Sequence, residues 1–557
     1  MRSDKILQRP EFSLNRGLFK SMGYSDDDLA RPLIGVANTW NTLVPGHFNL
    51  NLVSDYVKRG IYRGGATAVE FGGIAACDGT AQGHVGMHYI LPSREIICNE
   101  IEIMVQAHQL DAIVLLGSCD KIVPGMLMAA ARLDIPAILV PGGPMLGGVF
   151  FDGRKSDMTT CSEALGMLRR GIISDEEFVD LEELAGPSCG SCAFFGTANT
   201  MCSLSEAMGM TLPGGALIPA THADRLRMAQ ASGLAICKLV KEGINARKII
   251  NQDSLRNTVR VCLGVSGSTN AVLHLSAVAY EAEVDIDIME TFDEYSKNTP
   301  QIAKVNPAAK WDMEDFWKAG GIPRVVERMA PLLNQDVMTC TGATLAENIK
   351  GTRYRFPENK EIIKTLDEPF QKADGLAVLR GNLAPDTGVS KPGAIDPALW
   401  QFTGTARVFD SEEEANKAIL DKQIKDGDVV VIRYEGPKGG PGMREMYKAM
   451  KYLYGLGLAK KTALVTDGRF SGTNNGCFIG HISPEAAEGG PIAIVQDGDQ
   501  IEIDIKARKV ELLLTDDEIG ARLKAWRRPA PKIKRGYLAL YSRLAGSAAE
   551  GAVIKND

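Results

Sequence analysis

The fold class is decided by three consecutive stretches: Asp111-Ala-Ile-Val-Leu-Leu116, Gly117-Ser-Cys-Asp-Lys-Ile-Val-Pro-Gly125 and Met126-Leu-Met-Ala-Ala-Ala-Arg132. The first is apolar and the third has helical spacing, so the region predicts a β-strand, a tight turn and an α-helix. The turn carries Cys119, Asp120 and Lys121 in succession. A thiolate suits a soft metal such as iron, and a carboxylate suits a hard ion such as magnesium. The alternative is an ordinary strand-to-helix turn with a buried cysteine, because short motifs often arise by chance.

The same alternation of strand and helix extends on both sides of this turn. Apolar runs at residues 32–38, 68–75 and 135–143 predict strands, and residues 50–63 and 93–109 predict helices. Strands that alternate with helices at this spacing indicate an α/β domain with a parallel sheet. Ligands of such domains bind at the carboxyl ends of the strands, which is where the Cys119 turn is expected.

The second half of the chain has a different character. Residues 187–350 are mostly helical in pattern, and residues 359–374 are charged and lack a clear period. We therefore expect an N-terminal α/β domain at residues 1–365 and a C-terminal domain at residues 366–557. Within the latter, short strands are expected at residues 429–434, 463–466, 491–495 and 500–505. Many short strands in a compact stretch favour a β-barrel or a sandwich.

Length and composition restrict the function further. A chain of 557 residues is too long for one core. A net charge of −7 gives no support to nucleic acid or an anionic membrane as a partner. No apolar run reaches the roughly 18 residues needed to cross a bilayer, and the first residues lack a secretory pattern. We expect a cytoplasmic protein.

Eleven cysteines are spread along the chain. In a large cytoplasmic protein they are more often reduced, catalytic or metal-bound than paired in disulfides. The segment Cys189-Gly-Ser-Cys192 is open to three interpretations: a redox dithiol, a pair of metal or cluster ligands, or a helix start that contains two thiols. Together with Cys119, three thiols could surround an iron–sulfur cluster, although no ferredoxin spacing is present.

Three further positions carry groups with possible chemistry. Cys77 and Asp78 repeat the thiol–carboxylate pair after a strand, and Asp78 could instead cap a helix. Glu445, expected in a first helical turn after the glycine-rich residues 436–442, is either a helix-dipole partner or a magnesium ligand. Ser471 lies in another glycine-rich loop and is either a turn residue or a base whose pKa is lowered by nearby cations.

Taken together, these motifs resemble the dihydroxy-acid dehydratase family, which also contains sugar-acid dehydratases and 6-phosphogluconate dehydratase. The resemblance covers nearly the whole chain. The matching segments are Cys77-Asp-Gly, Leu91-Pro-Ser-Arg-Glu95, Cys119-Asp-Lys-Ile-Val-Pro-Gly-Met, Cys189-Gly-Ser-Cys192, Thr197-Ala-Asn-Thr-Met201, Gly267-Ser-Thr-Asn270, Gly436-Pro-Lys-Gly-Gly-Pro-Gly-Met443 and Gly468-Arg-Phe-Ser-Gly472.

The resemblance implies an N-terminal α/β domain, a C-terminal β-barrel domain and an active site between them. It implies an iron–sulfur cluster held by Cys119 and Cys192, and Ser471 as the catalytic base. It implies Mg²⁺ held by Asp78, Asp120, Glu445 and a carbamylated Lys121. It also suggests a homodimer or a homotetramer built from dimers.

The cluster type follows from a departure within the family. Members with a [2Fe–2S] cluster have a further cysteine where this chain has Gly46. Other members have the sequence Pro-Gly-His at this position, as in Pro45-Gly46-His47 of this chain. These members carry the extra thiol that Cys189 supplies here, and they are associated with a [4Fe–4S] cluster. We therefore favour [4Fe–4S] over [2Fe–2S], with Cys189 or Cys77 as the third ligand.

The resemblance implies a lyase that dehydrates (2R)-2,3-dihydroxy-3-methyl carboxylic acids to 2-keto acids in branched-chain amino-acid synthesis. Thr80 and Gln82 are polar where family members commonly have apolar residues. Because added polar groups could accept the extra hydroxyls of a sugar acid, a sugar-acid (aldonate) dehydratase with the same mechanism is the alternative.

Overall fold

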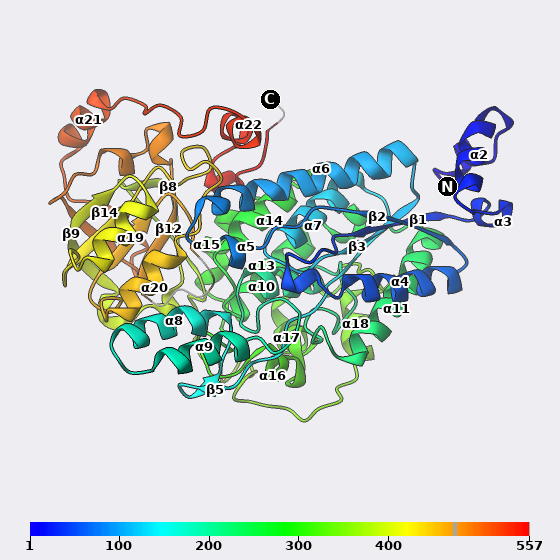
Figure 1. The fold of residues 1–557 in the computed structure, drawn as a ribbon, viewed down its shortest axis with the longest axis horizontal. Coiled ribbons are helices and arrows are strands. Elements are labelled where there is room, and N and C mark those ends of the chain that lie inside the picture. The colour runs from blue at the N-terminus through cyan, green and yellow to red at the C-terminus, as the bar shows by residue number, and fades with distance from the viewer. Residues whose placement is uncertain (471, 473–475, 556–557) are drawn as a thin grey trace.

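The computed structural model describes residues 1–470, 472 and 476–555. Figure 1 shows an α/β half, in blue to green, beside a second half in yellow to red that is built around a closed barrel. The predicted fold class, an N-terminal α/β part with a parallel sheet and a C-terminal β-barrel, is confirmed. In the described part of the chain, no helix combines the length and apolar character that crossing a membrane requires.

The α/β half contains a four-stranded parallel sheet with the order β2-β1-β3-β4. Its strands are β1 (Leu33–Asn38), β2 (Thr67–Gly72), β3 (Ala112–Leu116) and β4 (Ala137–Val140). The intervening helices are α4 (Leu50–Arg63), α6 (Ile90–His108) and α7 (Ile122–Leu133). The chain leaves β1 toward β2 and leaves β3 toward β4, in opposite directions, so a topological switch point lies between β1 and β3.

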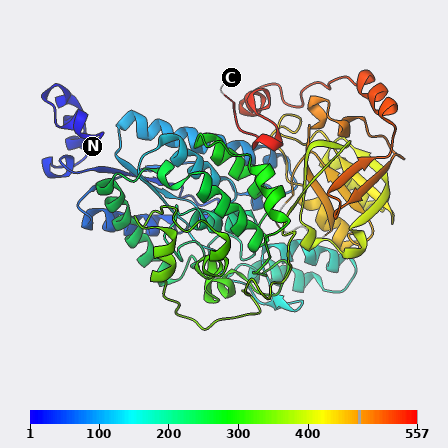
Figure 2. The same cartoon turned by 180° about the vertical axis from the view of Figure 1, so that it is seen from behind.

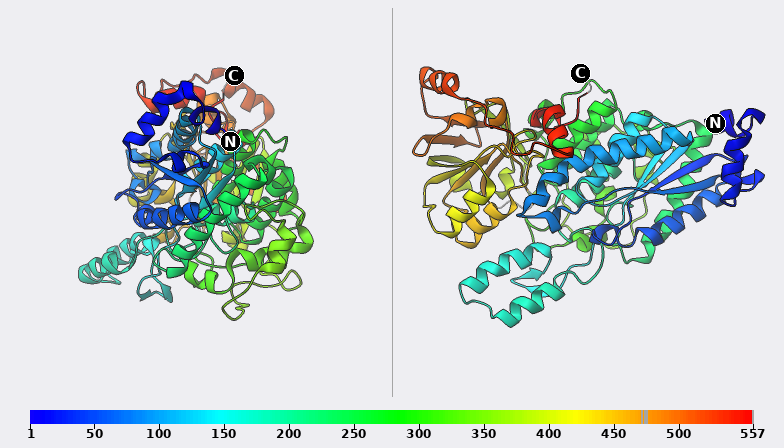
Figure 3. Two further views of the ribbon diagram at one scale, coloured as in Figure 1. Left: turned by 90° about the vertical axis from the view of Figure 1, so that its right-hand side faces the viewer. Right: turned by 45° about the horizontal axis from the view of Figure 1, so that its top comes forward.

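The helical middle of the chain surrounds this sheet. Its longer members are α10 (Thr197–Ala207), α11 (Ala223–Glu242), α13 (Gln252–Gly264) and α14 (Asn270–Glu281). Both α10 and α14 pack against α7 and add a further helical layer, seen in green in Figure 2. The two helices α8 (Met158–Arg169) and α9 (Asp175–Leu184) project as an arm, in cyan in Figure 3, and α8 contacts the barrel half.

The C-terminal barrel closes in the order β10-β11-β12-β8-β7-β14-β13-β9. Its strands are β7 (Ala377–Gly381), β8 (Ala384–Ser390), β9 (Gln401–Phe409), β10 (Asp428–Ile432), β11 (Ala463–Thr466), β12 (Cys477–Ser483), β13 (Gln500–Asp504) and β14 (Lys509–Leu512). Alternate apolar side chains such as Val429, Val465 and Ile501 fill its core.

Two local expectations are wrong. The apolar residues 491–495 form the 3₁₀ helix η8 (Pro491–Ile494) rather than a strand, because Pro491 fixes its own φ and has no N–H for a ladder. Cys189 and Cys192 do not open a helix: they lie in a loop between α9 and α10, which begins at Thr197.

The two halves are joined at several points. The C-terminal helix α22 (Tyr537–Leu544) returns to the start of α6, where the Tyr537 hydroxyl donates to Pro92 O at 2.8 Å (Figure 1). Lys451 of α20 (Tyr447–Gly455) pairs with Glu163 of the arm at 2.9 Å. Arg508, in the turn between β13 and β14, pairs with Asp293 of α15 (Ile288–Ser296) at 2.8 Å. These contacts fix how the barrel faces the carboxyl ends of the sheet.

His47 ties together the two loops at the switch point. Ser118 N, in the turn after β3, donates to His47 Nε2 at 3.2 Å. Because a backbone N–H can only donate, Nε2 is the acceptor and the ring proton is on Nδ1, which lies 2.9 Å from Thr39 O. His47 therefore holds the residue before Cys119 against the loop that follows β1.

This arrangement predicts a pH-dependent loss of stability. Burial lowers the pKa of His47 to about 4 from its ordinary value of 6.5, so between these values the unfolded chain binds the extra proton. We expect the stability advantage of wild type over His47→Gln to shrink by about 3 kcal/mol as the pH falls from about 7 to about 4. Thermal midpoints of both proteins across this range measure the effect. An advantage that does not change with pH would contradict it.

Candidate active site

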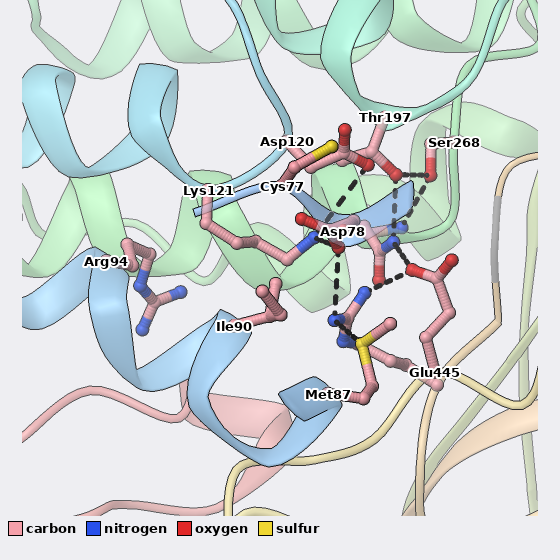
Figure 4. Close-up of polar contacts among 12 residues, drawn as sticks. Cys77, Asp78, Met87, Ile90, Arg94, Asp120, Lys121, Thr197, Ser268 and Glu445 are labelled. Atoms are coloured by element: carbon pink, nitrogen blue, oxygen red, sulfur yellow. Dashed lines mark hydrogen bonds and ion pairs between the residues drawn. The ribbon is translucent and has the colours of Figure 1, made fainter. Parts of the chain in front are cut away.

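Three acidic residues from distant parts of the sequence meet where the two halves face each other (Figure 4). Asp78 begins the short helix α5 (Asp78–Ala81) after β2, Asp120 lies in the turn after β3, and Glu445 comes from the barrel half. One oxygen from each carboxylate lies within 4.8 Å of the other two. We call these three residues the acidic group.

Two buried cations accompany the acidic group. Lys121 Nζ lies 2.7 Å from Asp78 Oδ2, and Arg469 Nη2 lies 3.4 Å from the same oxygen. Arg469 also forms an ion pair with Glu445. Both cations are fully buried. These two positive charges do not balance the negative charges of three carboxylates. Burial, followed by the charge on Asp78, raises the pKa of Asp120.

Neutral side chains hold Glu445 in place. Gln82 Nε2 donates to Glu445 Oε1 at 2.8 Å, and Asn270 Nδ2 lies 3.5 Å from Oε2. Asn270 also donates to Thr197 Oγ1 and to Phe470 O. The helices α10 and α14 thus reach the barrel's loop from the α/β half.

The position of Glu445 corrects one expectation. It lies outside the helix, in an extended segment that pairs with Arg469, and α20 begins only at Tyr447. In an extended backbone, consecutive side chains point to opposite sides. Arg444 pairs with Glu412 and Glu413, so the carboxylate of the next residue, Glu445, points the other way. Glu445 is therefore not a dipole partner within a helical turn.

Ser471, the predicted base, lies outside the described residues. Its two neighbours are described. Phe470 O accepts the hydrogen bond from Asn270, and the backbone of Gly472 packs so closely on Gly196 that an added Cβ would lie 3.1 Å from Gly196 Cα.

Three thiols lie beside the acidic group. Burial raises the pKa of Cys119 and of Cys192 well above the ordinary value, and negative charge on Cys77 raises each of them further. Figure 4 shows Cys77 next to Asp120. Cys189 differs, because it is only partly buried and burial alone raises the pKa of its thiol. Among the described residues, burial and the negative charges of neighbouring groups dominate at Cys119 and Cys192 and disfavour their thiolates, which a bound metal would stabilise.

Gly46 lies directly against these thiols. A Cβ at this position would be 2.7 Å from Cys119 Sγ and 3.2 Å from Ser191 N. The Gly190 N–H donates to Pro45 O at 2.9 Å, so the loops that carry Gly46, Cys119 and Cys192 converge. The Cys119 sulfur can lie this close to the backbone of residue 46 because Gly46 has no side chain.

Sequence reasoning did not single out Arg469 or Asn270 as functional residues, and it raised Gln82 only as a polar group for the hydroxyls of a sugar acid. Asn270 and Arg469 belong to motifs that carry the family resemblance, which is the signal that could have found them. Nothing in the local sequence indicates that Gln82 reaches Glu445, since the two residues are remote in the chain.

Comparison with known proteins finds relatives that match this chain along its length. The N-terminal model of the dihydroxy-acid/6-phosphogluconate dehydratases matches residues 31–348, and the C-terminal model matches residues 361–552. A dihydroxy-acid dehydratase of Caldanaerobacter subterraneus is 50% identical over all of this chain and 99% of its own length. Those of Ruminiclostridium cellulolyticum and Ignicoccus hospitalis are 47% and 48% identical over the whole of both chains. The chain therefore belongs to the dihydroxy-acid/6-phosphogluconate dehydratase family of hydro-lyases.

Proposed function

We propose that this enzyme dehydrates (2R)-2,3-dihydroxy-3-methyl carboxylic acids to 2-keto acids, as branched-chain amino-acid synthesis requires. The observation that carries the proposal is the meeting of hard carboxylate donors with soft thiols at one site. The names of the relatives support the same substrate class. A cytoplasmic homodimer or homotetramer stays a prediction.

The acidic group fits Mg²⁺, with Asp78, Asp120 and Glu445 as ligands, because carboxylate oxygens are the donors this ion takes. Asp78 Oδ1 is buried and has no hydrogen-bond partner among the described residues, which leaves a lone pair for an ion. Carbamylation of Lys121 would replace a cation with a carboxylate. That change would make the group more negative and favour a dication further.

The thiols fit an iron–sulfur cluster held by Cys119 and Cys192, for which we favour [4Fe–4S] over [2Fe–2S]. Gly46 offers no thiol, and its missing side chain lets the Cys119 sulfur lie against its backbone. For the third ligand we propose Cys77 rather than Cys189. The charge of Cys77 acts on both other thiols, whereas Cys189 shows no such interaction.

The bound ions would supply Lewis-acid polarisation of the substrate's carboxylate and hydroxyls. The alkoxide of Ser471 removes the C2 proton, the C3 hydroxyl leaves and takes up this proton to form water, and the resulting enol becomes a 2-keto acid. Arg469 and Asn270 hold Glu445 from opposite halves of the chain, so this carboxylate is in place before substrate arrives.

A sugar-acid substrate is the second candidate, and Gln82 is the observation that favours it. Its Nε2 is used by Glu445, but its buried Oε1 has no partner among the described residues. A carbonyl oxygen in this position could accept a hydrogen bond from an additional substrate hydroxyl.

A substrate panel on anaerobic, cluster-loaded enzyme tests the proposed function. We expect kcat/KM for 2,3-dihydroxy-3-methylbutanoate to exceed that for arabinonate, xylonate, gluconate and galactonate by at least roughly tenfold, with 2-keto acid measured as the product. Faster turnover of an aldonate would support the second candidate instead. Ser471→Ala is the matched control: it should keep iron and magnesium while turnover falls by about a hundredfold or more.

The third cluster ligand is tested by metal content rather than by activity. We expect Cys77→Ala to lose iron, sulfide and the visible absorption of the cluster after anaerobic purification, because a buried thiolate ligand is missing. Cys189→Ala is the matched variant and should keep wild-type iron. The reverse pattern would assign the ligand to Cys189, and two irons per wild-type chain would reject the [4Fe–4S] assignment.

A further inference from the structure

His274 is a buried histidine that the proposed reaction does not yet use. It lies on α14 one turn after Asn270, and residues four apart share one face of a helix. The Asn270 amide reaches Glu445 from that face. The His274 side chain is fully buried, and the charges of Lys121 and Arg469, the two cations that accompany the acidic group, act on its ring.

The tautomer of His274 is fixed by Arg94. Arg94 Nη1 lies 3.3 Å from His274 Nδ1, and a guanidinium can only donate hydrogen bonds. Nδ1 is therefore the acceptor, and the proton of the neutral ring is on Nε2. The ring is neutral because burial, followed by the charges of Lys121 and Arg94, lowers its pKa well below the ordinary value.

Arg94 is itself immobilised. It pairs with Glu95 at 2.7 Å and donates to the carbonyl oxygens of Gly551 and Ala552 at 2.8 and 3.2 Å. Its side chain is fully buried. The C-terminal residues thus hold Arg94, and Arg94 holds the orientation of the His274 ring.

The Nε2–H of His274 has no acceptor among the described residues. Buried donors of this kind are normally satisfied, so a partner supplied from outside the protein is expected. The charged groups whose fields act on the ring include Lys121 and Arg469, which have no acceptor atoms to offer. A neutral donor surrounded by cations suits an anionic oxygen.

We infer that His274 donates its Nε2–H to a carboxylate oxygen bound beside Lys121, which fixes the orientation of that carboxylate. The inference rests on the proposed function, from which two sources of this group arise. One is the carboxylate of the hydroxy-acid substrate. The other is the carbamate on Lys121.

Two variants separate the ring's two contacts. His274→Asn keeps an acceptor near the Nδ1 position for Arg94 but has no donor at the Nε2 position. His274→Gln can place an amide N–H near Nε2 and should restore part of the function. Thermal unfolding of both variants establishes that each is folded.

Binding of 2-hydroxy-3-methylbutanoate, an analogue that cannot lose a C3 hydroxyl, is measured by calorimetry on the magnesium-loaded, anaerobic holoenzyme. The carbamate is followed in parallel by ¹³C NMR with ¹³C-bicarbonate. If the acceptor is the substrate, His274→Asn should raise the Kd by at least roughly tenfold with the carbamate signal unchanged. If it is the carbamate, that signal should weaken at limiting bicarbonate while the Kd at saturating bicarbonate stays the same.

The inference fails if wild type binds the analogue and His274→Asn changes neither readout. Failure of wild type to bind any hydroxy acid would instead overturn the proposed function. A further measurement uses the wild-type protein alone and so does not depend on the folding of a variant. ¹⁵N NMR of labelled histidine should show one buried ring that is protonated at Nε2 and whose resonances shift when the analogue or bicarbonate is added. An Nδ1-protonated His274 would overturn the inference.

Discussion

Three carboxylates held together where the two halves of the chain face each other are the constraint around which this molecule is organised. Asp78 and Asp120 come from the sheet's loops and Glu445 from the barrel, yet their oxygens approach within 4.8 Å. Like charges at this separation repel strongly in a low dielectric, and the two cations Lys121 and Arg469 offset only part of that repulsion. The remainder of the fold must hold these side chains in place, which the pairing of Arg469 with both halves helps to achieve.

The sequence predicted regular elements well where one physical signal dominated. The helix expected at residues 50–63 is α4, because its apolar periodicity is uninterrupted. The strand expected at residues 491–495 failed because an apolar run next to a proline signals burial but not the type of element. The start of α6 at Ile90 was placed three residues too late, since Pro92 is tolerated in a first helical turn.

The site was predictable in part. Cys119, Asp120 and Asp78 follow strands of one parallel sheet, so their convergence at the carboxyl edge follows from topology alone. The contribution of Glu445, and the roles of Gln82 and Asn270 in holding it, depend on how the barrel docks onto the sheet. Such pairings between remote segments leave no trace in local periodicity. The local sequence left Glu445 as either a dipole partner or a magnesium ligand, and family resemblance favoured the ligand.

The same dependence on remote contacts determines at which stage of folding the complete site can form. Arg94, near the start of α6, is buried against carbonyl oxygens of Gly551 and Ala552, and the Ile554 N–H donates to Glu95 at 3.3 Å. Contacts over such separations require loop closure across nearly the entire chain, so they form late in folding. Asp78, Asp120 and the thiols all lie in the α/β half. Glu445, Arg469 and a fixed Arg94 are added only when the barrel and the C-terminal residues have docked.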